Sequence, residues 1–159
     1  MSIVSYAATL GAAAVGGVFY AFSTFTMRGL DGTDPATAIA AMRGINAQAQ
    51  ISGPFLVLFL GSAVLAVAVA VPAAAALSRP GSAYLLAGAV CALLALIVTI
   101  MFNVPLNNRL AALDPAQLSA LDAAREWAAY QRPWTAWNHV RTAAPLVGAA
   151  LMLAGIHLR

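Results

Sequence analysis

The residues best suited to chemistry gather in one short stretch, WTAWNHVRT at residues 134–142. If this stretch is helical, His139 points away from a narrow stripe formed by Trp134, Asn138, Arg141, Pro145 and Gly148. The stripe combines an aromatic ring, an amide and a guanidinium with small residues that lead into an apolar segment. A lone arginine here would extend to lipid headgroups. With Asn138 one turn away on the same face, we expect Arg141 to enter an interior polar site.

A second polar group lies in FNVPLNNRL at residues 102–110, where Asn103 and Asn107 are four residues apart and so share a helix face. Pro105 lacks an N–H and displaces the carbonyl of Met101 from its usual partner. An asparagine amide can satisfy that carbonyl, so a structural role at a kink and a substrate role both stay open. Asn46 and Gln50 form a third pair with the same spacing.

These groups must be positioned by apolar helices, because apolar residues make up 62% of the 159 residues and charged residues only 8%. A soluble domain carries about 25% charged residues, so the chain is predicted to be an integral membrane protein. Four segments reach the length of a bilayer span, and we expect them to form one multi-pass domain over residues 1–159. They run over about residues 3–27, 54–77, 83–104 and 133–158.

The predicted fold class is therefore all-α, a four-helix membrane bundle with short interfacial helices in loops one and three. Asp34 followed by proline, and Asp114 followed by proline, are the expected starts of these two helices. Loop two, residues 78–82, has the composition of a turn. With four spans, loops one and three lie on the same side, where the three polar groups would meet. The arginine bias places that side in the cytoplasm and both termini outside the cell membrane.

Several function classes are disfavoured by what the sequence contains. All five acidic residues lie outside the expected spans, which disfavours proton-coupled transport. The two histidines lie at opposite ends of one segment and Cys91 is alone, so neither a metal site nor a haem site is indicated. The net charge of +3 comes from scattered arginines, which argues against nucleic-acid binding.

Four motifs in this order resemble the DUF1772, or anthrone oxygenase-like, family of membrane proteins. They are GGVFYAFSTFTMRGL at 16–30, MRGINAQAQ at 42–50, FNVPLNNRL at 102–110 and WTAWNHVRT at 134–142. The resemblance covers nearly the whole chain and implies a four-span bundle. For the characterised branch it also implies that a polyketide anthrone is oxygenated to an anthraquinone without metal, flavin or other cofactor.

Under this resemblance, the expected partner is a lipophilic small molecule held within the bilayer. The expected catalytic donors are Arg141, Asn138, Asn103 and Asn107. The expected substrate-binding residues are Trp134, Trp137, Asn46 and Gln50. His139 is disfavoured as the base, which leaves water, a substrate phenolate or a loop residue.

The alternative is a non-catalytic four-span protein that binds a lipid or quinone-like ligand, or that serves as a structural subunit. In that case the polar groups would hold helices together. A homo-oligomer through small-residue faces such as Gly11, Gly148 and Gly155 also stays open. An interior cavity that brings residues 103, 107, 134, 138 and 141 together is the observation that the first reading requires.

Overall fold

The computed structural model describes residues 2–159, and every regular element in that range is a helix. The predicted all-α fold class is therefore confirmed. The elements are α1 (Ser2–Ala21), η1 (Phe22–Thr26), α2 (Met27–Asp31), α3 (Pro35–Ile51), α4 (Gly53–Ala74), α5 (Ser82–Val98), η2 (Thr99–Asn103), α6 (Val104–Ala111) and α7 (Ala120–His157). The two η segments are single π-helical turns inside longer helices.

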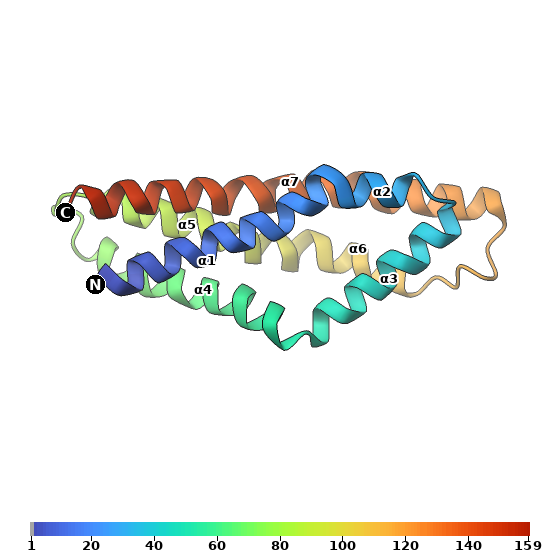
Figure 1. Cartoon of the computed structure of the whole chain (residues 1–159), viewed down its shortest axis with the longest axis horizontal. Coiled ribbons are helices and arrows are strands. Elements are labelled where there is room, and N and C mark those ends of the chain that lie inside the picture. The colour runs from blue at the N-terminus through green and yellow to red at the C-terminus, as the bar shows by residue number, and fades with distance from the viewer. Residues whose placement is uncertain (1) are drawn as a thin grey trace.

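Four continuous helices are long and apolar enough to cross a membrane, as the sequence predicts. They cover Ile3–Asp31, Gly53–Ala74, Ser82–Ala111 and Ala120–His157. Figure 1 shows both termini and the α4–α5 connection at one end of the bundle, and the other two connections at the opposite end. The predicted topology, with loops one and three on the same side, therefore holds.

Helix α7 differs from its prediction, which placed the start of the fourth span near Pro133. The helix begins at Ala120, where Ser119 accepts a hydrogen bond from the backbone N–H of Asp122, and it continues through Pro133 and Pro145. At 1.5 Å per residue, its 38 residues extend about 57 Å, well beyond the roughly 30 Å of a hydrocarbon core. The first turns of α7 therefore extend outside the apolar layer, and α3 packs against them (Figure 1).

The two predicted loop helices have different outcomes. In loop one, Asp34 caps α3 by accepting a hydrogen bond from the Thr37 N–H, and Pro35 is its first residue, as predicted. In loop three, the predicted helix after Asp114 is wrong. The Asp114 carboxylate accepts hydrogen bonds from the Ala116 N–H and the Gln117 amide and closes a turn instead. Because Ser119 is the effective cap, the helical spacing that follows belongs to α7.

The outer surface of the bundle is apolar along the expected spans. Helix α4 shows this most clearly, because its exposed large side chains follow one another at helical spacing. They are Val57, Leu60, Val64, Val67 and Val71. Such a continuous apolar face is unusual on a water-soluble monomer and is suited to contact with lipid.

Close helix packing in the bundle depends on glycine. A Cβ at Gly88 would lie 2.6 Å from the Gly148 carbonyl oxygen, and a Cβ at Gly148 would lie 2.6 Å from the Gly88 oxygen. Gly155 meets the start of α5 in the same way, and Gly11 meets Ser62 of α4. Gly11, Gly148 and Gly155 therefore pack within one chain. A homo-oligomer stays a prediction.

The core divides into three clusters along the bundle. One, which includes Val69 and Met152, joins α1, α4, α5 and α7 near the termini. Another, which includes Ile39 and Trp127, joins α2, α3, α6 and the first half of α7. Between them lies a small cluster around Phe19 and Phe59. The change from four-helix packing to packing against α3 occurs at this level, and the polar groups lie there.

Candidate functional site

A cavity of about 400 Å³ lies where α3 and α4 diverge from the rest of the bundle. It is within the range of roughly 300–1,000 Å³ that is typical of small-molecule sites. Its wall is formed by Val18, Phe19, Phe22, Met42, Ile45, Asn46, Gln48, Ala49, Ser52, Phe55, Phe59, Thr99, Asn107, Trp134 and Arg141. Residues from all four spanning helices and from α3 thus contribute to one site.

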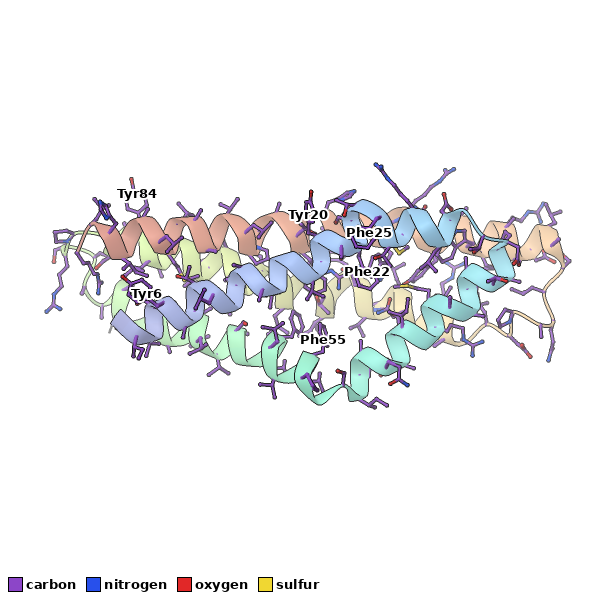
Figure 2. The ribbon with its side chains drawn as sticks, in the orientation of Figure 1. Tyr6, Tyr20, Phe22, Phe25, Phe55 and Tyr84 are labelled. Atoms are coloured by element: carbon purple, nitrogen blue, oxygen red, sulfur yellow. The ribbon has the colours of Figure 1, made fainter. Side chains whose placement is uncertain are left out.

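Aromatic rings form much of the cavity wall. Phe55 stacks on Phe59 with a centroid distance of 5.6 Å, and Phe59 meets the edge of Phe19 at 5.8 Å. Phe22 packs on Trp134 at 5.7 Å. Figure 2 shows Phe22 and Phe55 pointing toward each other from the first and second spans. Such a wall suits a flat, lipophilic ring system.

Arg141 is the charged group of the cavity and is only 4% exposed. Its Nη2 donates to the Asn138 Oδ1 at 2.8 Å, and its Nη1 donates to the Thr99 Oγ1 at 3.3 Å. The guanidinium carbon lies 4.3 Å from the ring centre of Phe19 and 4.8 Å from that of Trp134. Its Nε has no hydrogen-bond partner among residues 2–159. The charge is therefore solvated by neutral groups and is not paired with a carboxylate.

Asn138 holds Arg141 in place and connects two spans. Its Nδ2 donates to the Phe19 carbonyl and to the Ser23 Oγ, both at 2.8 Å. The Ser23 hydroxyl also lies 2.9 Å from the Thr142 hydroxyl. The side chain of Asn138 is fully buried and lies behind the cavity wall, not in it.

The two π turns supply the hydroxyls of this network. In η1 the Met27 N–H bonds to the Phe22 carbonyl, and in η2 the Val104 N–H bonds to the Thr99 carbonyl, each five residues back. Ser23 lies in η1 and Thr99 begins η2, so both widened turns face the same part of α7. Single π turns are frequent at functional sites, because they redirect side chains without ending the helix.

Asn107 is fixed by two buried donors from α7. The Trp134 Nε1 donates to its Oδ1 at 2.8 Å, and the Tyr130 hydroxyl donates to the same atom at 2.9 Å. The Asn46 amide lies 3.4 Å from the Tyr130 hydroxyl and donates to it. This second network therefore joins α3, α6 and α7 at the loop side of the cavity.

Asn103 is fully buried but does not line the cavity. Its Nδ2 donates to the Trp134 carbonyl at 3.2 Å, and its Oδ1 has no partner among residues 2–159. The sequence suggested instead that an asparagine would satisfy the Met101 carbonyl displaced by Pro105. The chain accommodates Pro105 by the widened turn η2 directly before it. The amide of Asn103 bonds instead to α7 and joins two helices.

The residues predicted as site candidates fall into three groups. Arg141, Asn107, Asn46 and Trp134 line the cavity. Asn138 and Asn103 are buried beside it and bond to its wall residues or their backbone. Trp137 and Gln50 do not line it: Trp137 stacks on Phe102 at 3.6 Å, and Gln50 is exposed on α3. The proposed catalytic and binding roles stay predictions.

Sequence reasoning missed several residues of the site. Phe55 and Phe59 are four apart just after Pro54, and this spacing would have indicated one aromatic face. Ser23, Thr99 and Tyr130 had no local signal, because their roles depend on contacts between helices.

The groups that commonly take up protons lie away from the cavity. His139 is exposed and, with Cys91, lines a separate apolar groove on the outside of α5 and α7. Glu126 pairs with Arg109 at 2.9 Å, and Asp31 accepts from the Trp127 Nε1. Within residues 2–159 there is no cluster of three histidine, cysteine or acidic side chains placed to hold a metal ion.

The model of the family described as Anthrone oxygenase matches residues 44–151, which is more than half of the chain. The matched range contains FNVPLNNRL, WTAWNHVRT and most of MRGINAQAQ. No curated protein and no solved structure matches the chain.

Proposed function

The chain belongs to the anthrone oxygenase family, and on that premise we propose that it is a membrane-embedded oxygenase that needs no cofactor. Its substrate would be a lipophilic polycyclic compound of the anthrone type. The substrate would occupy the aromatic-lined cavity in the cell membrane, between the four spans.

The reaction makes few demands on the protein. An anthrone has an acidic C–H between two aromatic rings and opposite a ketone, and loss of that proton gives an electron-rich enolate. The enolate transfers electrons to O₂ and forms a C–O bond at that carbon, giving a hydroperoxide after protonation. Loss of water then breaks the O–O bond, takes the remaining C–H proton and leaves the second carbonyl of the quinone. One O₂ is consumed and one water is released for each quinone.

The observation that carries this proposal is the position of Arg141. A buried guanidinium without a carboxylate partner faces a cavity bounded by Phe19, Trp134 and other aromatic rings. A positive charge fixed beside an aromatic slot stabilises an oxyanion that develops on a flat substrate. The cost of burying this charge is explained if it acts on the ligand.

The test is O₂ consumption by the purified protein in lipid nanodiscs with anthrone as substrate. We expect uptake above the spontaneous rate, with one quinone formed for each O₂ consumed. Arg141→Met should lower the turnover number about a hundredfold, the usual loss when one oxyanion donor is removed. Arg28→Met is the matched control, because Arg28 is exposed and does not line the cavity. Uptake equal to the spontaneous rate across several polycyclic phenols and anthrones would reject the proposal.

The same cavity also supports the second candidate, a protein that binds a quinone-like ligand without converting it. Its aromatic wall and single charge would recognise a flat ligand oxygen equally well. Saturable binding of anthraquinone, together with no O₂ uptake on any anthrone, would favour this candidate.

A further inference from the structure

The cavity holds a positive charge but no side chain that commonly accepts a proton. Within residues 2–159, the polar side chains of its wall are Asn46, Gln48, Ser52, Thr99, Asn107, Trp134 and Arg141. None of these is a carboxylate, an imidazole or a thiol. Arg141 can therefore stabilise the anion of a ligand that loses a proton, but no base among the described residues lies beside that ligand in the cavity.

The amide of Asn107 adds a second donor. An indole N–H only donates hydrogen bonds, so the Asn107 atom 2.8 Å from the Trp134 Nε1 is the carbonyl oxygen. The Tyr130 hydroxyl, at 2.9 Å, bonds to the same oxygen. The amide is thus held in one orientation, and its NH₂ remains for a ligand, since Asn107 lines the cavity.

We infer that the cavity binds its ligand as a phenolate or enolate, with the charged oxygen at Arg141 and the Asn107 amide as a second donor. The O–H or C–H proton passes to water before or during entry, and no electrons move in this step. The inference concerns the site of the proposed function and names its substrate class: a flat, lipophilic acid of the phenol or enol type.

Other charged and titratable groups near the cavity leave this assignment unchanged. Tyr130 donates its hydroxyl proton to Asn107, which only the neutral phenol can do. Arg43 on α3 does not line the cavity. Arg109 on α6 is paired with Glu126 of α7, and the Asp31 carboxylate is bound to Trp127. Arg141 therefore dominates the field that a ligand meets.

The probe for the test is 2-naphthol, whose absorption spectrum changes on ionisation, titrated with the protein in nanodiscs. We expect the pKa of the bound probe to fall by about 1 to 3 units relative to empty nanodiscs, as for an acid beside a fixed arginine. The matched probe is 2-methoxynaphthalene, which cannot ionise. Its affinity should be the same across the pH range.

Variants assign the effect to the two donors. Arg141→Met should abolish the shift and still bind 2-methoxynaphthalene as wild type does, whereas Arg141→Lys should keep part of the shift. Asn107→Asp still accepts from Tyr130 and Trp134 but places a negative charge where the NH₂ was, so naphtholate affinity should fall at least about tenfold. Equal shifts in wild type and Arg141→Met, or no shift in wild type, would overturn the inference.

The outcomes separate the inference from the proposed function. A lowered probe pKa without O₂ uptake would leave anion binding standing and reject the oxygenase. O₂ uptake with an unshifted probe pKa would support the oxygenase and reject anion binding.

Discussion

Two buried asparagines, Asn138 and Asn103, provide a direct test of how the polar groups stabilise the bundle. Both side chains are fully buried, and both have an amide that bonds to a backbone carbonyl on another helix. From the sequence they look equivalent. The structure predicts that replacing each by leucine, which has nearly the same shape, has very different effects on the free energy of unfolding.

Asn138→Leu removes three hydrogen bonds of 2.8 Å, to the Phe19 carbonyl, the Ser23 hydroxyl and the Arg141 guanidinium. The first two bonds join α7 to the first span, and hydrogen bonds between helices in a membrane average about 0.6 kcal/mol each, which gives about 1 kcal/mol. Loss of an acceptor for the buried charge adds about 1 to 2 kcal/mol. We therefore expect a destabilisation of about 2 to 3 kcal/mol.

Asn103→Leu removes one hydrogen bond, of 3.2 Å, worth about 0.6 kcal/mol. It also removes a carbonyl oxygen that is buried without a partner among residues 2–159, at a cost to the native state of about 1 kcal/mol. The two terms oppose each other, so the variant should be as stable as wild type or slightly more stable.

The assay is reversible unfolding by SDS in mixed micelles, followed by tryptophan fluorescence and analysed as a two-state transition. Gln50→Leu, at an exposed position of α3, is a control for replacing a polar side chain by leucine at the surface. The reasoning is refuted if Asn103→Leu costs as much as Asn138→Leu, because the hydrogen-bond pattern would then not determine stability.

Three further predictions use the same preparations. Gly148→Ala should lower the free energy of unfolding in SDS by about 1 to 3 kcal/mol, because its Cβ would lie 2.6 Å from a backbone oxygen. Gly17→Ala is the control and should be neutral or stabilising, since its Cβ would meet no atom within 4 Å. Hydrogen bonds from the Thr37 side chain and from the Thr37 backbone N–H lower the pKa of the Asp34 carboxyl. The capping contribution of Asp34 is therefore present above the ordinary pKa of about 4 and is lost as pH falls through the lowered pKa. Hydrogen exchange at the start of α3 should then become faster on acidification, and Asp34→Asn should remove this pH dependence. Tyr130→Phe should lower naphtholate affinity severalfold while 2-methoxynaphthalene binds normally, since the Asn107 amide loses one of the two donors that orient it.

The sequence predicted the span count and topology because these depend on hydropathy alone. The cap at Asp34 was also predictable, since the cap and the proline that follows act locally. The start of α7 was not, because Pro133 was read as a boundary. A proline inside a long helix is tolerated where packing against other elements holds the helix on both sides, and Trp127 and Trp134 provide that packing around residue 133.

The candidate site was predictable only in part, because it depends on contacts between helices as well as on spacing within one helix. Helical spacing on a single segment identified Trp134, Asn138 and Arg141 as one face, and the structure buries all three. Helical spacing could not show which tryptophan lines the cavity. Trp134 lines it, whereas Trp137 stacks on Phe102, and this difference depends on where the first and third spans lie around α7. The π turns were also invisible, since they shift the side-chain register by one residue without a distinctive composition.

The partners of Arg141 follow a consistent chemical logic. Asn138 and Thr99 offer neutral oxygens, and Phe19 and Trp134 offer ring faces, so the guanidinium is solvated without being neutralised. A carboxylate in any of these places would lower the cost of burying the arginine and would also cancel the field that a ligand meets. The two π turns contribute to the same arrangement, because Thr99 accepts from Arg141 and Ser23 accepts from the Asn138 amide beside it. A network built only to hold helices together would gain from neutralisation, whereas one built to attract an anion would lose its function. The pattern of partners therefore favours ligand binding as the reason that this charge is buried.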